Sequence, residues 1–243
     1  MYVITFANPK GGSGKTTSAM LLAEQIHQAG GRVVVLDCDP NQNIVQWGAA
    51  REKGSLDVPF VIVPVPAEDA LMDTVDTYRN QADYLIIDLE GTASQTVTYA
   101  ISQSDLVLVP FEPSPMEARQ AARAIQLVRN TGRMIGRKIS HSLLLTRTNA
   151  AFQTTDEKEL RKETDGNNVP VMGTAIVRRA AYTRIFREGA MLTELRDQAG
   201  AEVAGNTPSQ QERILKPLDA ALQNAAAFAQ EVMDLLTNEE ASA

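Results

Sequence analysis

The chain has 243 residues, a net charge of −7, one cysteine and two histidines. The single cysteine, Cys38, excludes an intramolecular disulfide and a cysteine-ligated cluster within one chain, and two histidines disfavour a His-rich metal site. Because no apolar run of about 18 residues is present and the first apolar run begins at once, we expect neither a transmembrane helix nor a signal peptide, and a cytoplasmic setting.

Strand-like and helix-like segments alternate along the chain. Seven apolar runs predict strands at residues 2–7, 32–37, 60–65, 84–88, 106–110, 142–146 and 171–176. The segments between and after them predict helices at residues 16–29, 41–53, 67–80, 92–103, 115–131, 152–165 and 178–188. Most apolar runs are continuous rather than alternating, which is typical of parallel strands covered on both faces. The pattern predicts an α/β fold with a doubly wound, mostly parallel sheet flanked by helices.

The C-terminal part predicts one long helix over residues 209–236. Ser209 is its expected N-cap, because Glu212 follows three residues later as in a capping box. Pro217 lies inside this segment and is expected to kink or split the helix.

Glycine, asparagine and proline gather in residues 197–208, which are therefore predicted to form a loop. No internal repeat is visible. We expect a single domain over residues 1–237, followed by a frayed tail at residues 238–243.

A glycine-rich loop joins the first predicted strand to the first predicted helix. Residues 8–17 read Asn-Pro-Lys-Gly-Gly-Ser-Gly-Lys-Thr-Thr, and strand, glycines, Lys-Thr and helix together are the context of a phosphate-binding P-loop. The backbone N–H groups of such a loop face a bound anion, and the helix N-terminus adds its dipole. The residues expected to cradle the phosphates are Gly11, Gly12, Ser13 and Gly14.

The side chains of this loop have distinct expected roles. Lys15 is predicted to reach the β- and γ-phosphates of ATP, and the Thr16 hydroxyl is predicted to hold Mg²⁺. Pro9 stands where the usual first glycine would be, and Lys10 follows it. A second lysine at that point has no role in an ordinary single-nucleotide site.

Two predicted strands end in carboxylates that suit a metal ion. Asp37 and Asp39 alternate along one strand end, so both are expected to point toward the phosphate site. One would bind Mg²⁺ through water and the other would orient the attacking water; the alternative is a simple Asp-Pro turn. Asp88 ends an apolar strand in the manner of a Walker-B segment, whose carboxylate holds the hydration shell of Mg²⁺.

Together these segments resemble the ParA/MinD family of deviant Walker-A ATPases, and more closely its ParA branch. The resemblance rests on residues 10–17, 37–40, 86–88 and 105–114, and it is clearest over residues 1–150. It implies a P-loop ATPase whose two subunits sandwich ATP and Mg²⁺.

The resemblance also implies roles for single residues. Lys10 would cross to the phosphates of the partner subunit, and Thr17 would contact the α-phosphate. Asp39 matches the carboxylate near the attacking water, and Asp88 matches the Walker-B aspartate. From its position after the strand at residues 143–146, rather than from a family motif, Asn149 is the expected adenine contact. We therefore predict a catalytic group of Lys10, Lys15 and Asp39, and a metal site of Thr16, Asp37 and Asp88.

The sequence departs from the family pattern at two places. Asn41 follows Asp-Pro where the family commonly has Gln. After Asp88 the family commonly has one residue and then proline, whereas this chain reads Leu89-Glu90-Gly91. Glu90 could tune hydrolysis or accept a partner contact, or it could simply begin a loop that faces water.

Basic residues are concentrated in one part of this acidic chain. Residues 115–187 carry 14 Lys/Arg and 6 Asp/Glu, whereas the rest carries 9 and 24. This block predicts nonspecific binding of duplex DNA by phosphate neutralisation, and the alternative is a set of solvated helix faces. The densest group is Arg178, Arg179, Arg184 and Arg187, and further pairs are Arg119 with Arg123 and Arg133 with Arg137. Nothing after Lys216 is basic, so a MinD-like membrane helix is not expected.

The resemblance thus implies a ParA-like ATPase that dimerises with ATP, binds nonspecific DNA near the nucleoid and positions a cargo such as a plasmid. Its hydrolysis would be slow and stimulated by a ParB-like or other cargo adaptor. The alternative is a nucleotide-gated adaptor that recruits a DNA-processing or conjugative-transfer complex, as VirC-type relatives are thought to do. A metabolic ligase or kinase on this fold is weaker, because no substrate-specific constellation is visible.

Overall fold

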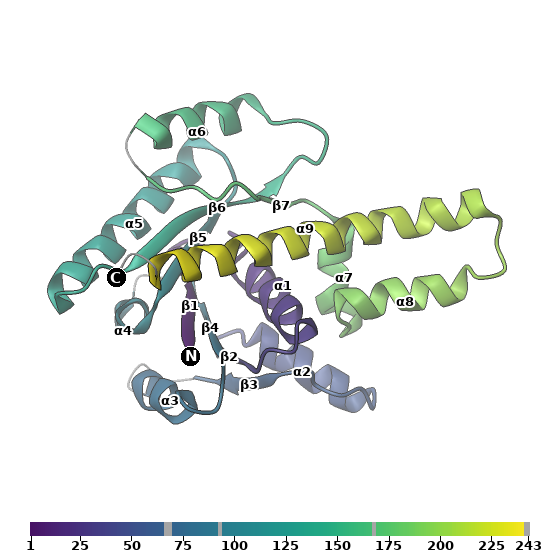
Figure 1. Ribbon diagram of the computed structural model, residues 1–243, viewed down its shortest axis with the longest axis horizontal. Coiled ribbons are helices and arrows are strands. Elements are labelled where there is room, and N and C mark those ends of the chain that lie inside the picture. The colour runs from purple at the N-terminus through teal and green to yellow at the C-terminus, as the bar shows by residue number, and fades with distance from the viewer. Residues whose placement is uncertain (66–69, 92–93, 167–168, 241–243) are drawn as a thin grey trace.

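A seven-stranded parallel sheet forms the centre of the protein (Figure 1). The computed structural model describes residues 1–65, 70–91, 94–166 and 169–240. Across the sheet the strands follow the order β3-β2-β4-β1-β5-β6-β7. Their bounds are β1 Tyr2–Phe6, β2 Val33–Cys38, β3 Val61–Pro64, β4 Tyr84–Leu89, β5 Leu106–Phe111, β6 Ser140–Thr148 and β7 Ile176–Val177. This arrangement confirms the predicted doubly wound fold.

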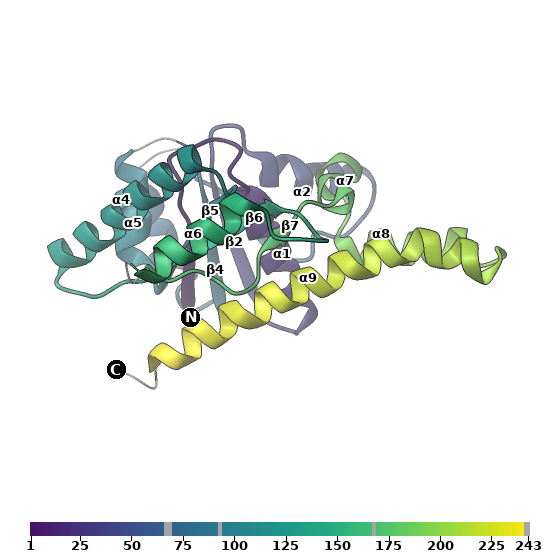
Figure 2. The same cartoon turned by 90° about the horizontal axis from the view of Figure 1, so that it is seen from above.

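Helices cover both faces of the sheet (Figures 1 and 2). One face packs against α1 Lys15–Gln28, α2 Asn43–Lys53, α7 Ala180–Glu188, α8 Leu192–Glu202 and α9 Pro208–Glu240. The other face packs against α3 Ala70–Tyr78, α4 Gln95–Gln103, α5 Pro115–Ile135 and α6 Thr155–Gly166. Alternate residues of each strand enter the two cores, as Ile4 and Val3 of β1 do, which explains why the strands are apolar without interruption. The predicted beginnings of α3 and α4, at residues 67 and 92, fall outside the described residues.

The last predicted strand is much shorter than expected. Only Ile176–Val177 form β7, while Val171 makes an isolated bridge with Leu143. Between them, the backbone N–H groups of Gly173 and Thr174 donate to the carboxylate of Glu231 on α9, at 2.6 and 2.7 Å. These N–H groups therefore find a side chain of a distant helix in place of a neighbouring strand.

A side-chain amide of α9 also completes the hydrogen bonds of β7. Asn224 donates to the carbonyl of Ala175 at 2.8 Å and accepts the N–H of Val177 at 3.0 Å. The hydroxyl of Tyr182 donates to the same amide oxygen, also at 3.0 Å.

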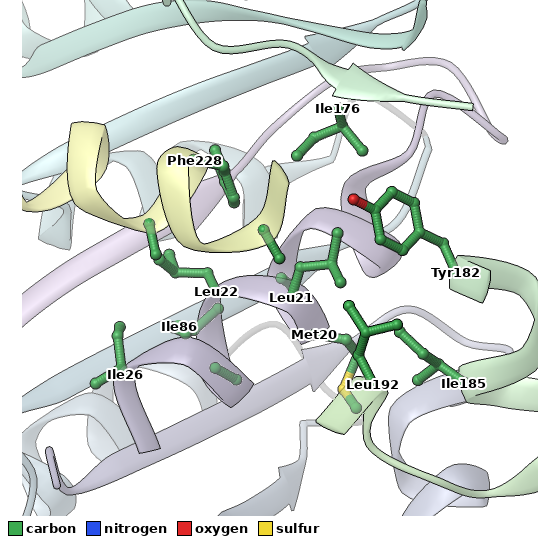
Figure 3. Close-up of a cluster of buried hydrophobic side chains, with 14 of the residues drawn as sticks. Met20, Leu21, Leu22, Ile26, Ile86, Ile176, Tyr182, Ile185, Leu192 and Phe228 are labelled. Atoms are coloured by element: carbon green, nitrogen blue, oxygen red, sulfur yellow. The ribbon is translucent and has the colours of Figure 1, made fainter. Parts of the chain in front are cut away.

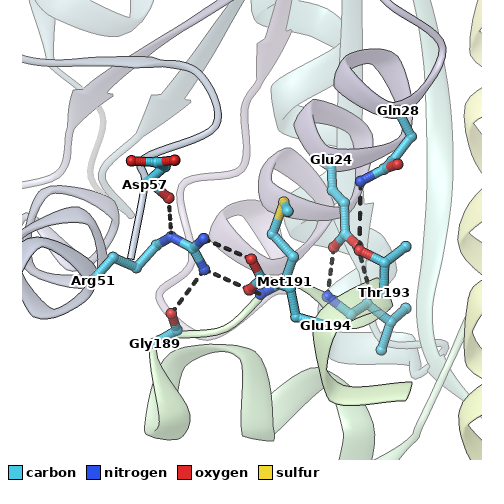
Figure 4. Close-up of polar contacts among 9 residues, drawn as sticks. Glu24, Gln28, Arg51, Asp57, Gly189, Met191, Thr193 and Glu194 are labelled. Atoms are coloured by element: carbon cyan, nitrogen blue, oxygen red, sulfur yellow. Dashed lines mark hydrogen bonds and ion pairs between the residues drawn. The ribbon is translucent and has the colours of Figure 1, made fainter. Parts of the chain in front are cut away.

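Helix α8 is the element that the sequence prediction missed, because residues 197–202 were expected to be loop. Its N-terminus is held by residues far away in the chain (Figure 4). Glu24 of α1 accepts the backbone N–H groups of Leu192 and Thr193, both at 2.8 Å. These bonds satisfy donors that a helix N-terminus leaves free. With the first half of α9, α8 forms a hairpin that projects beyond the sheet (Figure 1).

Helix α9 runs unbroken across Pro217, so the expected split is wrong. It begins at Pro208, one residue before the predicted cap, and the side chain of Gln210 accepts the N–H of Thr207 at 3.1 Å. Glu212 instead pairs with Lys216. The helix continues through residue 240, within the tail that was expected to fray, and residues 241–243 lie outside the described part.

The apolar face of α9 seals the core over α1. Its buried side chains recur every three or four residues: Leu218, Ala221, Ala225, Phe228, Val232 and Leu236. Phe228 is completely buried and lies beside Leu21 and Leu22 of α1 (Figure 3). No helix of the described residues is long and apolar enough to cross a membrane.

Candidate functional site

The glycine-rich loop lies at the carboxyl edge of the sheet, between β1 and α1. Gly12 and Gly14 have φ angles of 75° and 98°, which lie in the left-handed region where a side chain is strained. A Cβ at Gly14 would also meet the methyl group of Thr146 at 3.1 Å. Thr146 fixes the loop further by donating its hydroxyl to the carbonyl of Ser13 at 2.8 Å. The backbone itself thus requires glycine at positions 12 and 14, whereas a Cβ at Gly11 would meet nothing within 4 Å.

Lys15 is folded back across the loop. Its amine donates to the carbonyls of Asn8 and Lys10, each at 3.2 Å, and the residue is only 5% exposed. Burial lowers the pKa of this amine, while the nearby carboxylates of Asp88, Asp39 and Glu90 oppose that shift. The amine is therefore held inside the turn, where a phosphate bound by the loop would meet it.

Asp88 ends β4 directly beside the loop. In the parallel register it lies opposite both Phe6 of β1 and Asp37 of β2. Neither of its buried carboxylate oxygens has a hydrogen-bond partner among the described residues. Burial raises its pKa to about 7, against the opposing influence of the Thr16 hydroxyl and the Lys15 amine.

A magnesium ion suits these groups. Mg²⁺ binds to one or two carboxylates together with waters and substrate phosphates, rather than to an all-protein cage. An orphaned buried carboxylate at Asp88 with the Thr16 hydroxyl beside it matches that donor set. The described part of the chain contains no cluster of three or more His, Cys, Asp or Glu side chains that could hold a metal ion.

Asp37 and Asp39, the two carboxylates at the end of β2, differ in burial and in hydrogen-bond partners. Asp37 is buried and accepts the backbone N–H groups of Ile44 and Val45 at 2.9 and 3.1 Å, so it holds the N-terminus of α2. Burial raises its pKa, and these N–H groups oppose the shift. Asp39 is half-buried and accepts both N–H groups of Asn41, from the backbone and the side chain, at 2.8 and 2.9 Å. The metal role of Asp37 and the water-orienting role of Asp39 stay predictions.

Gly91 is a site residue that sequence reasoning passed over. A Cβ at this position would lie 2.5 Å from the backbone nitrogen of Gly11 and 2.9 Å from the carbonyl carbon of Lys10. The backbone after β4 therefore packs directly on the phosphate loop.

A cavity of about 450 Å³ adjoins the loop next to Gly14 and Thr17. Asn149, the expected adenine contact, is not part of its lining: its side chain accepts the N–H of Ala151 at 2.8 Å in an exposed loop. The cavity is lined instead by residues of β6, β7 and α7, among them Arg147, Val177, Arg178, Arg179, Tyr182 and Phe186. Arg147 has a φ of 53° and lies at an irregularity of β6.

The predicted group of four arginines is divided by the fold. Three of them are paired within the chain: Arg178 with Glu112 at 2.8 Å, and Arg184 and Arg187 with Glu188 at 2.9 and 2.8 Å. Arg178 and Arg179 line the cavity beside the loop.

A second group of cations joins the predicted Arg179 to two residues that sequence reasoning missed, Arg213 and Lys216. Arg179, Arg213 and Lys216 line a cavity of about 520 Å³ at the start of α9. Glu212 lies in the same lining and pairs with Lys216 at 3.5 Å. This surface brings together residues more than thirty positions apart, so no local run of charge marks it.

The parallel sheet, the glycine loop and the carboxylates at neighbouring strand ends define the P-loop fold that MinD shares. Residues 1–238 match the model of the VirC1 protein family, so the chain belongs to that family. The predicted ParA/MinD resemblance is thereby confirmed.

Relatives and solved structures agree with this assignment. The chain is 31% identical to protein ParA of Rhizobium radiobacter over 239 residues, or 98% of each chain. It is 25% identical to maintenance of carboxysome distribution protein A of Halothiobacillus neapolitanus, over 80% of this chain and 88% of the relative. The ATP complex of an McdA variant from Cyanothece shares its fold, with a TM-score of 0.67, 17% identity, and coverage of 92% and 96%. So does MinD of Aquifex aeolicus, with a TM-score of 0.64, 18% identity, and coverage of 96% and 98%.

Proposed function

We propose that this protein is a ParA-like ATPase that binds and hydrolyses ATP with Mg²⁺ to position a cargo. The observation that carries the proposal is the juxtaposition of the Lys15 amine, buried in the loop, with the orphaned carboxylate of Asp88. One group suits the phosphates and the other suits the metal ion that accompanies them. A relative of similar fold, the McdA variant, is an ATP complex.

The chemistry is phosphoryl transfer to water. The loop N–H groups and Lys15 stabilise the charge that develops on the transferred phosphoryl group, and Asp39 orients the attacking water. Thr16 and Asp88 would hold Mg²⁺, which when bound would supply further charge neutralisation. In the dimer, Lys10 reaches the phosphates bound to the other subunit, and a cargo adaptor stimulates turnover.

Substitutions in the loop test this scheme. Lys15→Ala is expected to abolish ATP binding measured by calorimetry, because the phosphates lose their buried cation. Asp39→Ala is expected to bind ATP and accumulate as a dimer that turns over slowly, as judged by sedimentation and phosphate release. Rapid turnover by Asp39→Ala would contradict its assigned role.

Nonspecific duplex DNA is the proposed surface on which the ATP-bound dimer moves. The cations around the cavity at the start of α9 support this better than the paired arginines of α7. Binding should require ATP and fall steeply with salt, since it rests on phosphate neutralisation. Arg213→Ala is expected to weaken binding to all DNA sequences. It should also reduce the slope of the logarithm of DNA affinity against the logarithm of salt concentration by about one. Arg79→Ala, in an exposed pair with Asp76 on the other side of the sheet, is the matched control.

The match to the VirC1 family favours a second candidate, a nucleotide-gated adaptor that recruits a DNA-processing complex. In that case ATP binding alone would switch partner recruitment, and hydrolysis would be incidental. A partner pull-down with Asp39→Ala distinguishes the two. If Asp39→Ala binds its partner with ATP and does not release it, the positioning ATPase is favoured. If Asp39→Ala both binds and releases its partner without hydrolysing ATP, the adaptor is favoured.

A further inference from the structure

Lys10, the additional lysine of the phosphate loop, forms an ion pair with Glu117 of its own chain. Glu117 lies in the first turn of α5, where Ser114 caps the helix by accepting the backbone N–H of Glu117 at 3.4 Å. The pair therefore joins the loop that follows β1 to the helix that follows β5. No feature of the sequence indicated this contact.

The carboxylate of Glu117 is buried and depends on Lys10 for charge compensation. Its side chain is 9% exposed, whereas that of Lys10 is 40% exposed. Among the described residues, its buried Oε2 atom has no hydrogen-bond partner, and its Oε1 atom forms the ion pair with Lys10. Removing the amine would leave a buried charge without compensation, which is unfavourable.

The backbone of Lys10 is fixed by hydrogen bonds that are independent of its ion pair with Glu117. The N–H of Lys10 donates to the side chain of Asn8 at 2.9 Å, and its carbonyl accepts the amine of Lys15 at 3.2 Å. Asn8 in turn donates to the carbonyl of Pro110 at the end of β5. A new partner for the Lys10 amine must therefore be reached by rotation of its flexible stem alone.

We propose that Glu117 is a positioning residue that retains Lys10 against its own subunit until a nucleotide triphosphate on a second copy competes for the amine. This inference rests on the proposed function, in which Lys10 acts in trans. Since one amine cannot hold Glu117 and a partner's phosphates together, the ion pair opposes dimerisation. A triphosphate carries more negative charge than one carboxylate and can therefore compete for the Lys10 amine. A diphosphate carries less charge than a triphosphate and competes less well. The ion pair of Lys10 with Glu117 therefore makes dimerisation selective for the ATP-bound state.

The test compares Glu117→Gln with the wild type in sedimentation equilibrium with Mg²⁺ and a nonhydrolysable ATP analogue. We expect Glu117→Gln to lower the dimer dissociation constant by about tenfold, within the usual range of coupling between sites. In the Lys10→Ala background the same substitution should have no effect. An equal effect with and without Lys10, or a weaker Glu117→Gln dimer, would overturn the proposal.

Glu157→Gln is the matched control. Glu157 is also a buried first-turn glutamate: its N–H donates to the hydroxyl of Thr154, and it pairs with Arg161 at 3.5 Å. The Glu157→Gln substitution should leave the dimer dissociation constant unchanged. If Glu117→Gln fails to fold, Glu117→Asp withdraws the carboxylate from Lys10 and should act in the same direction.

A second measurement separates this proposal from the proposed function. The reactivity of the Lys10 amine toward acetic anhydride can be measured by mass spectrometry in the nucleotide-free chain. Glu117→Gln should raise it several-fold, while Glu157→Gln should not. A wild type that never dimerises refutes the trans role of Lys10, whereas unchanged labelling refutes the retention by Glu117.

Discussion

Asp88 shows how burial prepares a site for a cation. Its carboxylate is 0% exposed and both of its oxygens are orphaned among the described residues. Leaving such a group without a partner costs the folded chain on the order of 1–3 kcal/mol or more. A bound cation would recover that energy. The cost to the fold and the affinity for the metal therefore have the same origin.

The close packing of Gly91 predicts that adding a single methyl group at this position impairs ATP hydrolysis. Because a Cβ here would lie 2.5 Å from the nitrogen of Gly11, Gly91→Ala must displace the phosphate loop. We expect the ATPase rate to fall about a hundredfold, the scale of a displacement of about 1 Å at a reacting centre. Gly205→Ala is the control, since its Cβ would meet nothing within 4 Å. A normal rate in Gly91→Ala would show that the loop tolerates the shift.

Asp83 predicts how stability depends on pH. Hydrogen bonds from the Arg32 side chain and backbone lower the pKa of this carboxyl to about 2. Since the folded pKa lies below the unfolded value of 3.8, the contribution is present above about pH 4 and is lost as the pH falls toward 2. Denaturant titrations from pH 6 to 2 should show a shallower acid loss for Asp83→Asn than for the wild type. Equal slopes would mean that this pair is screened by solvent.

At the scale of elements, α8 is held in place by two helices that precede it by more than a hundred residues. Glu24 of α1 caps its N-terminus, and Arg51 of α2 binds Glu194 through two hydrogen bonds of 2.6 and 2.7 Å (Figure 4). Arg51 also donates to the carbonyls of Asp57 and Gly189 and lies 5.0 Å from the ring centre of Trp47. These contacts fix the hairpin of α8 and α9 to the nucleotide half of the molecule.

Removing one partner of this ion pair should be costly. Arg51 is 2% exposed, so Glu194→Ala leaves a buried guanidinium without its carboxylate. We expect a loss of about 3 kcal/mol in the free energy of unfolding, measured with urea at an unchanged m-value. Glu188→Ala, which breaks the pairs of Glu188 with Arg184 and Arg187 on α7, should cost less than about 1 kcal/mol. Similar losses in both variants would refute the distinction.

The same elements show what sequence reasoning could predict. Strands β1 to β6 were found because each is a continuous apolar run, and the phosphate loop was found because its residues are contiguous. Helix α8 was missed because Gly200 suggests a loop and the cap that favours the helix comes from Glu24. Gly91 and Glu117 were missed as site residues because they are distant in sequence from the phosphate loop that they contact. Gly91 follows β4, and Glu117 follows β5.

At the scale of the whole molecule, the phosphate loop contacts both helical layers. Lys15 begins α1 in one layer, and Lys10 pairs with Glu117 in the other. Thr146 of β6 holds the loop from the side. A ligand that fixes the loop therefore acts on the joint between the two halves of the core.

Nucleotide binding should accordingly stabilise the entire chain. At a ligand concentration of 100 times Kd, the gain is about 2.7 kcal/mol, seen as a rise in Tm. Chelation of Mg²⁺ should remove part of this gain, and Thr16→Ala should make the remainder insensitive to Mg²⁺. Lys15→Ala should show no rise with ATP. A rise of equal size in Lys15→Ala would place the nucleotide elsewhere.

The amide of Asn224 has a consequence for the solubility of the sheet. In a parallel ladder, a residue of the next strand bonds the carbonyl of one residue and the N–H of the residue two further along. Asn224 meets Ala175 and Val177 in this way, and so acts as a one-residue eighth strand that cannot be extended. The outer edge of β7 is thereby closed to strands from other molecules, which protects a long hydrophobic sheet from edge-to-edge aggregation.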